Sequence, residues 1–282
     1  MIKFHEEVLL DEETSDSLVI DLKRYTSKES LSNVHGGRWI MPNTSDEFKN
    51  LLSNSEPWRK VYRKLSSPEF LSACMESLEM PLVGIELNPY FSKRVIPQKF
   101  RRLDALKSKR IRETSLIGIF LYLIYSLWNN FCFYLFRFTR RFSKKIHLDI
   151  LFDVSQAENG YVREIHRDSD SRYVVFLLYL NDLSTNGNGG ELNLFEYTGS
   201  HNNNPGPQPA EENCVLIKKI FPSKGKLVIF KNNKDAFHSV SEMSGYDRER
   251  IFCYGSFTVL NGLNPNFNKS SQKFKTPWRL YY

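Results

Sequence analysis

The chain has 282 residues, of which 41% are hydrophobic and 25% are charged. This balance is typical of a folded globular protein and excludes collagen, a pure coiled coil and a wholly disordered chain. The four cysteines are widely scattered and form no CxxC pair, which argues against a disulfide scaffold or a zinc ribbon and favours a reducing, cytoplasmic setting. Residues 1–7 contain no apolar run, so we expect no secretory signal there.

The first region, residues 1–112, is predicted to be mostly helical. Apolar residues recur at helical spacing in three stretches, residues 11–27, 44–55 and 67–80. Ser45 and Ser67 are candidate N-caps. Gly36 and Gly37 predict a turn between helices.

Positive charge is concentrated in residues 93–145, which hold 14 Lys or Arg against two acidic residues, a local net charge of +12. Since the whole chain carries +7, the remainder carries 7 − 12 = −5. This asymmetry indicates one basic surface rather than a uniformly basic nucleic-acid binder, and we expect no nucleic-acid partner.

Within this region, the 23 residues 114–136 are all uncharged. As a helix they would be about 34 Å long, enough to cross a bilayer core. Asn129 and Asn130 disfavour a single span, and basic residues on both flanks give no orientation. Residues 113–145 are therefore predicted to be an apolar helical insertion with basic flanks. This segment could span a membrane, lie on an anionic membrane surface, pack on the protein itself, or contact a partner. The expected location of the protein is therefore cytoplasmic, with membrane association as an alternative.

From residue 146 the pattern changes to short β-branched or aromatic runs separated by Gly, Asn, Pro and Ser clusters. Eight such runs occur, at residues 147–155, 161–168, 172–182, 189–197, 214–221, 226–232, 236–243 and 250–260. Strands without intervening helices predict a sandwich or barrel such as a jelly roll over residues 146–260, followed by a polar tail, residues 261–282. Residues 201–213 predict a surface loop. Residues 186–190 predict a hairpin turn rather than a phosphate loop, because a strand follows them.

Two His-x-Asp pairs could each hold a metal ion, because residues two apart on a strand face the same side. They are His147 with Asp149 and His166 with Asp168. The residues downstream favour the second pair. They read Tyr-Leu-Asn at 179–181, Gly-Gly-Glu-Leu at 189–192, Pro222 followed by Gly-Lys-Leu-Val-Ile-Phe at 225–230, and His238.

In this order, over residues 151–259, the sequence resembles the 2-oxoglutarate and Fe(II)-dependent dioxygenases, specifically their prolyl-4-hydroxylase-like branch. The resemblance implies an α+β fold in which a double-stranded β-helix (jelly roll) forms the catalytic core. It also implies that His166, Asp168 and His238 bind Fe(II), and two histidines with one carboxylate do leave coordination positions open for a co-substrate and dioxygen. The pair at His147 lacks the downstream order, and we expect it to be structural.

By the same resemblance, 2-oxoglutarate is the co-substrate and ascorbate is a candidate additional cofactor. The far carboxylate of 2-oxoglutarate needs a cation. Arg248 lies ten residues after His238, the commoner spacing. Arg250 opens the last strand and better matches the family's distance to the Gly-Ser-Phe at 255–257, so we choose Arg250 and keep Arg248 as the alternative. Tyr179 matches a tyrosine that hydrogen-bonds this carboxylate, and Ser256 stands where many relatives have Trp.

We therefore expect an Fe(II)- and 2-oxoglutarate-dependent dioxygenase, specifically a hydroxylase, that yields succinate and carbon dioxide. Its substrate is a small molecule, a peptidyl group or a lipid-linked group, which the barrel motifs do not identify. Arg163 and Arg172 are candidates to meet an acidic substrate or to be solvated. The alternatives are a non-catalytic metal-binding jelly-roll module and a membrane-surface scaffold.

Overall fold

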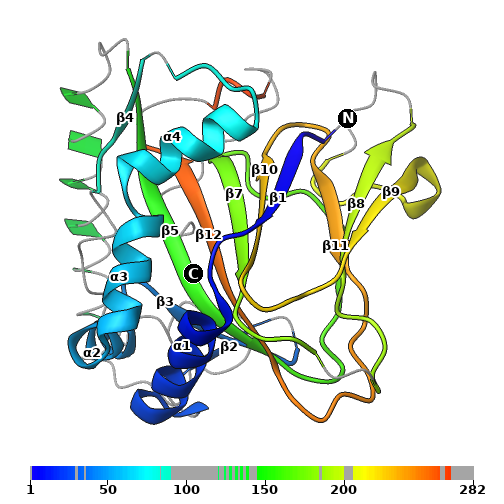
Figure 1. Ribbon diagram of the computed structural model, residues 1–282. Helices are drawn as coiled ribbons and strands as arrows, with labels where there is room; N and C mark the ends of the chain where they lie inside the picture. Colours follow the sequence, from blue (N-terminus) through cyan, green and yellow to red (C-terminus); the bar gives the residue numbers. More distant parts are fainter. Residues whose placement is uncertain are drawn as a thin grey trace.

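The computed structural model describes residues 2–28, 31–34, 36–82, 84–89, 145–183, 186–199, 206–260 and 264–267, together with ten helical positions between Phe120 and Thr139. Two facing β-sheets form its centre, and helices cover the outer face of the larger sheet (Figure 1).

The larger sheet has the strand order β1-β10-β7-β12-β5-β3-β2. Four of these strands come from the predicted core, β5 (Ile146–Ala157), β7 (Arg172–Tyr179), β10 (Lys226–Lys231) and β12 (Arg250–Val259). β12 lies in the middle of the sheet and runs antiparallel to both β5 and β7. Each of its ten residues is buried, since the helices cover one face of the strand and the smaller sheet covers the other.

The smaller sheet has the order β6-β11-β8-β9. Its strands are β6 (Arg163–His166), β8 (Leu192–Tyr197), β9 (Cys214–Ile220), which follows the short helix η4 (Glu211–Asn213), and β11 (Phe237–Val240). Along the chain, the eight strands β5 to β12 alternate between the two sheets except at β8 and β9. Eight strands arranged in two such sheets make a jelly roll. The predicted core fold and its eight strands are therefore confirmed.

The first ninety residues add four short strands to the larger sheet that the sequence analysis did not predict. β1 (Phe4–Val8) pairs with β10, while β2 (Ser32–Val34) and β3 (Arg38–Pro42) form a hairpin beside β5. β4 (Ile85–Leu87) runs parallel to the start of β5. The glycines at 36 and 37 do form a turn, with φ of 50° and 89°, but the turn joins two strands rather than two helices.

Four helices pack beside this sheet, α1 (Glu12–Tyr25), α2 (Asp46–Asn54), α3 (Glu56–Leu65) and α4 (Pro68–Ser77). Three of them occupy the predicted stretches, and α3 was not predicted. Ser45 and Ser67 are N-caps as expected, because their hydroxyl oxygens accept the backbone N–H groups of Phe48 at 3.0 Å and Phe70 at 3.1 Å.

Two hydrophobic clusters follow from this layering. One lies between the helices and the larger sheet and includes Trp58, Phe70 and Phe176. The other lies between the two sheets and includes Tyr179 and Phe252. Alternate residues of β7 and β12 belong to different clusters, as the two-residue period of a strand requires. The second cluster adjoins the cavity described below.

The turn at residues 186–190 leads into β8, as predicted, but it connects strands of different sheets and is therefore not a simple hairpin. The predicted domain boundary at residue 112, most of the insertion 113–145 and most of the tail 261–282 fall outside the described residues and stay predictions. In the part of the chain that is described, no helix has both the length and the hydropathy needed to cross a bilayer.

Candidate metal centre and co-substrate cavity

Strands β6 and β11 bring the three predicted metal ligands together. His238 is the register partner of His166 across this antiparallel pair, and their ring centroids are 4.4 Å apart. Asp168 follows β6 by two residues, and its Oδ2 lies 3.8 Å from Nε2 of His238. One ligand atom from each residue lies within 4.8 Å of the others. The three side chains can therefore hold one metal ion on one side, leaving further positions open.

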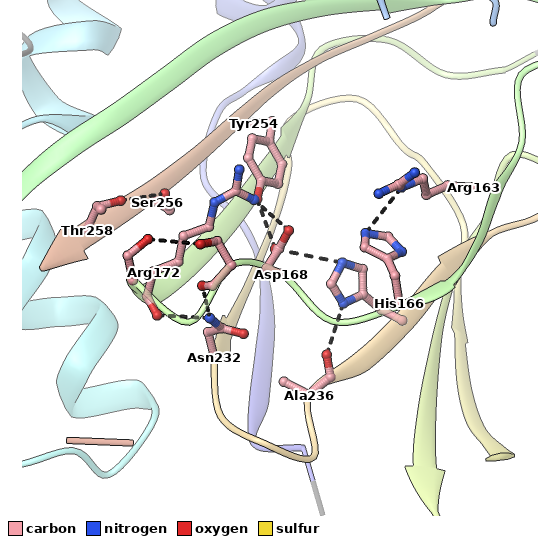
Figure 2. A network of polar contacts seen from close by, with 12 residues as sticks. Arg163, His166, Asp168, Arg172, Asn232, Ala236, Tyr254, Ser256 and Thr258 are labelled. Atoms are coloured by element: carbon pink, nitrogen blue, oxygen red, sulfur yellow. Dashed lines mark hydrogen bonds and ion pairs between the residues drawn. The ribbon is translucent and has the colours of Figure 1, made fainter. Parts of the chain in front are cut away.

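Backbone carbonyl groups fix the tautomers of both histidines. Nδ1 of His166 lies 2.8 Å from the carbonyl oxygen of Glu164, and Nδ1 of His238 lies 3.1 Å from that of Ala236. A carbonyl can only accept, so each Nδ1 carries the hydrogen and each Nε2 keeps a lone pair for a metal. Figure 2 shows where Ala236 lies relative to His166 and Asp168.

The protonation states also suit a divalent cation. Burial, assisted by the neighbouring His238, lowers the pKa of His166 to about 3. Burial also lowers the pKa of His238. Burial alone would raise the pKa of Asp168, but Arg172 and the two histidines outweigh it and hold that pKa at about 2. At neutral pH the group therefore consists of two neutral imidazoles and one carboxylate, the forms that bind metal.

The three side chains line a cavity of about 720 Å³ between the sheets. Arg250, at the start of β12, also lines this cavity and is fully buried. Its Nη2 donates a hydrogen bond to the hydroxyl of Tyr179 at 3.2 Å. Its Nε and Nη1 are buried without a hydrogen-bond partner among the described residues. A buried guanidinium with two unused donors fits an incoming carboxylate such as that of 2-oxoglutarate.

Arg248 lies elsewhere. Its side chain is 61% exposed, and it lines a separate surface cavity of about 390 Å³ beside Asp182 and Lys224. Of these two candidates, Arg250 lines the cavity that also holds the metal ligands and Arg248 does not, which favours Arg250 for the carboxylate. The two roles remain predictions.

The other His-x-Asp pair lies away from this group. His147 and Asp149 are buried near the start of β5, where they are register partners of Glu86 on β4 and Thr258 on β12. Neither belongs to the group of potential metal ligands found among the described residues. Their placement agrees with the expected structural role.

Arg38 and Tyr254 are two of the cavity residues that the sequence analysis did not single out. Arg38 reaches the cavity from β3, where its Nη2 forms an ion pair with Asp153 at 3.0 Å. Tyr254 reaches it from β12, four residues after Arg250 and on the same face of the strand. That alternation was a usable signal for Tyr254, whereas nothing in the sequence connects residue 38 with the core.

Of the two arginines that were expected to meet an acidic substrate or to be solvated, Arg172 is paired inside the protein. Arg172 Nη1 lies 2.5 Å from Oδ1 of Asp168, so it pairs with a predicted metal ligand rather than with solvent. Arg163 lines the cavity, and its Nε donates a hydrogen bond of 3.4 Å to Nε2 of His166. This nitrogen is the one that would bind the metal, so the contact has to break when a metal binds.

Part of the chain is similar in sequence to known oxygenases. Residues 137–257 match the sequence model of the 2OG-Fe(II) oxygenase superfamily. The chain is 24% identical over 241 residues to prolyl 3-hydroxylase OGFOD1 of Xenopus laevis, covering 84% of this chain and 41% of that protein. It is also 24% identical over 217 residues to the Mus musculus protein of the same name, covering 74% of this chain and 34% of that one. The chain thus spans less than half the length of these relatives.

Solved prolyl-4-hydroxylases are similar at a lower level. The enzyme of Pseudomonas putida has a TM-score of 0.45 and 16% identity, covering 92% of this chain and 93% of that one. A prolyl 4-hydroxylase of Phytophthora capsici has a TM-score of 0.48 and 12% identity, covering 99% and 65%.

Proposed function

Because residues 137–257 match the sequence model of the 2OG-Fe(II) oxygenase superfamily, we propose that the chain is an Fe(II)- and 2-oxoglutarate-dependent dioxygenase that hydroxylates its substrate. The observation that carries this proposal is the group formed by half-buried His166 and buried Asp168 and His238, which lines one cavity with the guanidinium of Arg250. The comparisons lend no support to a non-catalytic module or a scaffold. The whole catalytic activity is part of this proposal, because the chain covers only 41% and 34% of the two relatives' lengths.

The cavity residues would bind the iron and the co-substrate. The two Nε2 atoms and Oδ2 of Asp168 would hold the iron, and Arg250 with Tyr179 would hold the far carboxylate of 2-oxoglutarate. With both bound, the site would supply oxidative decarboxylation to succinate and carbon dioxide, with transfer of one oxygen atom of dioxygen to the substrate. Apolar side chains of the same cavity, including Leu177 and Phe252, would exclude water, which strengthens the charge interactions inside.

A peptidyl proline is the substrate that we propose. Both curated relatives named above are called prolyl 3-hydroxylases. The cavity volume of about 720 Å³ is within the range of sites that accept drug-sized ligands, so it leaves room for a side chain above the co-substrate.

The test is succinate formation from 2-oxoglutarate by anaerobically purified protein that is then given Fe(II) and air. We expect succinate from the wild-type chain, stimulated by proline-containing peptides, and none from His166→Ala. Failure to bind both Fe(II) and 2-oxoglutarate would overturn the oxygenase proposal. Turnover that proline-containing peptides do not stimulate would overturn the substrate assignment alone.

We also propose that the basic, apolar segment docks on an anionic membrane surface. The described helical positions of this segment include eight large apolar side chains, each of which is at least 48% exposed. They are Phe120, Ile124, Leu127, Trp128, Phe131, Tyr134, Leu135 and Phe138. Their spacing of three, four and seven residues puts them on one helix face. The net charge of +12 over residues 93–145 complements anionic lipid.

Vesicle sedimentation tests this second proposal. We expect the full chain to sediment with phosphatidylserine-containing vesicles at low ionic strength and not with pure phosphatidylcholine. The double substitution Trp128→Glu and Phe131→Glu should abolish sedimentation. The control Val215→Glu, at a half-exposed apolar position on β9, should not. Sedimentation of the double variant equal to that of the wild type, or none by the wild type, would contradict docking.

A further inference from the structure

Two side chains from outside the metal-binding group hold the carboxylate of Asp168. Its Oδ1 accepts a hydrogen bond from Nη1 of Arg172 at 2.5 Å, and its Oδ2 accepts one from the hydroxyl of Tyr254 at 2.9 Å. Oδ2 is also the oxygen that faces Nε2 of His238 at 3.8 Å. Figure 2 shows Tyr254 and Arg172 approaching this carboxylate from the side opposite His166.

The position of Tyr254 follows from strand β12. Arg250, Phe252, Tyr254 and Ser256 lie on its cavity face, because residues two apart on a strand point the same way. Ser256 is small and fully buried, and its hydroxyl lies 3.1 Å from that of Thr258, so it does not enter the metal site. The aromatic ring that borders Asp168 is therefore supplied by residue 254.

Two guanidinium groups fix the ring of Tyr254. The Cζ atom of Arg172 lies 4.9 Å from the ring centroid and that of Arg38 lies 5.5 Å from it. Arg38 is in turn held by Asp153 at 3.0 Å and by the hydroxyl of Ser155 at 2.8 Å. With the ring contacted by both cations, the hydroxyl has little freedom to leave Oδ2.

We propose that Tyr254, together with Arg172, is a positioning residue that sets how Asp168 binds the metal. The hydrogen bond from Tyr254 occupies one lone pair of Oδ2 and leaves the other for the metal, while Arg172 holds Oδ1 away from it. The carboxylate then binds through one oxygen, which keeps coordination positions open for 2-oxoglutarate and dioxygen. This inference depends on the metal site of the proposed function.

Co(II) binding to the full chain tests the inference without turnover, since the visible absorption of Co(II) reports both affinity and coordination number. We expect Tyr254→Phe to weaken Co(II) binding about 10-fold to 100-fold, the usual loss when such an outer partner is removed. We also expect a fall in absorption intensity, as Asp168 turns and adds its second oxygen. Tyr62→Phe is the control, because it removes another partly buried hydroxyl, one that accepts a hydrogen bond from Asn43 and does not touch Asp168, and it should bind Co(II) as the wild type does.

The possible outcomes distinguish loss of the metal site from loss of the positioning role of Tyr254. No Co(II) binding by the wild type would remove the metal site and with it the proposed function. Wild-type affinity and spectrum in Tyr254→Phe, even with a lower melting temperature, would overturn the positioning role alone. Should Tyr254→Phe fail to fold, Arg172→Lys perturbs the other hydrogen bond to the same carboxylate. An unchanged affinity and spectrum in that variant would equally overturn the inference.

Discussion

The guanidinium group of Arg250 is fully buried and has no carboxylate partner among the described residues. Burying an unpaired cation is costly, and the contacts with the Tyr179 hydroxyl and with the rings of Tyr179 and Phe252 offset only part of that cost. Two N–H donors remain directed at no described acceptor. An anionic ligand would complete the pairing, which makes this residue a strong candidate for carboxylate recognition.

Substituting each arginine separately tests that assignment. We expect Arg250→Ala to raise the KM for 2-oxoglutarate by two orders of magnitude or more, because removing one partner of a buried charge pair costs about 3–5 kcal/mol. Arg248→Ala, which alters an exposed side chain in another cavity, should leave KM within a factor of two to three. The measurement is succinate formation against 2-oxoglutarate concentration. A larger effect of Arg248→Ala would reassign the carboxylate to that residue.

At this scale, the sequence was informative where neighbours in the chain are also neighbours in space. His166 and Asp168 are two residues apart, and their order relative to His238 is a family pattern. Tyr254 and the arginine beside its ring behave differently. Tyr254 lies 86 residues from Asp168, and Arg38 comes from a hairpin that reaches the cavity only because β3 pairs with β5. Such pairings depend on sheet topology, which no local pattern contains.

Strand β12 is the element on which the larger sheet depends. It pairs with β5 over ten register positions and with β7 over seven, and it carries cavity residues on one face. On the opposite face, Gly255 leaves space for the buried ring of Phe176 on β7. A Cβ atom at residue 255 would lie 2.0 Å from Cζ of that ring, far inside van der Waals contact.

Gly255→Ala therefore tests how tightly this element is packed. We expect the free energy of unfolding to fall by about 1–3 kcal/mol, the usual cost of overpacking a core, as measured by chemical denaturation. A double-mutant cycle with Phe176→Leu supplies the control, since the smaller side chain removes the clashing ring. An equal loss from Gly255→Ala in both backgrounds would show that the ring is not the cause.

The strands of the jelly roll and three of the four helices beside the sheet were predictable from the sequence, whereas the strands added by the first ninety residues were not. The eight core strands carry enough alternating apolar residues to be recognised, and three helices show a clear helical period. Strands β2 and β4 have three residues each, too few for any period, and they exist because β3 and β5 offer open edges. Helix α3 was missed although its sequence carries a usable signal, because Trp58, Val61, Tyr62 and Leu65 stand at helical spacing on one face.

For the whole molecule, the buried imidazoles couple folding to pH. In the unfolded chain a histidine titrates near pH 6.5, whereas burial holds the pKa of His166 at about 3 in the folded state. Above pH 6.5 both states are neutral and His166 adds no pH dependence. Between pH 6.5 and 3 the unfolded chain takes up a proton that the folded chain does not, so stability falls as the pH falls.

We therefore expect metal-free protein to lose up to about 1.4 kcal/mol per pH unit through His166 once the pH is well below 6.5. Urea denaturation at pH 7.5, 6.5 and 5.5 measures this slope. His166→Asn should make it shallower. Asp168 adds a separate loss only below its unfolded pKa of 3.8, outside this window. An equal dependence of stability on pH in the wild type and in His166→Asn would mean that His166 takes up its proton in the folded state at the same pH as in the unfolded state.

The helices and the larger sheet share one hydrophobic cluster, and two buried cysteines report on it from opposite sides. Cys74 lies on α4 and Cys253 on β12, and both belong to that cluster. Burial raises the pKa of Cys74 to about 12 and that of Cys253 well above the usual range, so both thiols stay protonated and unreactive while folded. Cys214, at the start of β9, is only partly buried.

Since α4 packs directly on this sheet, through Phe70 against Phe176 at 5.3 Å, we expect the helical layer and the sheet to open together. In a Cys132→Ser background at pH 8, a thiol reagent should then label Cys214 quickly, and Cys74 and Cys253 slowly at one common rate. Peptide mapping of the labelled protein resolves the three sites. A Cys74 rate far above that of Cys253 would mean instead that the helices open while the jelly roll stays closed, and the cluster between them would then not be a single cooperative unit.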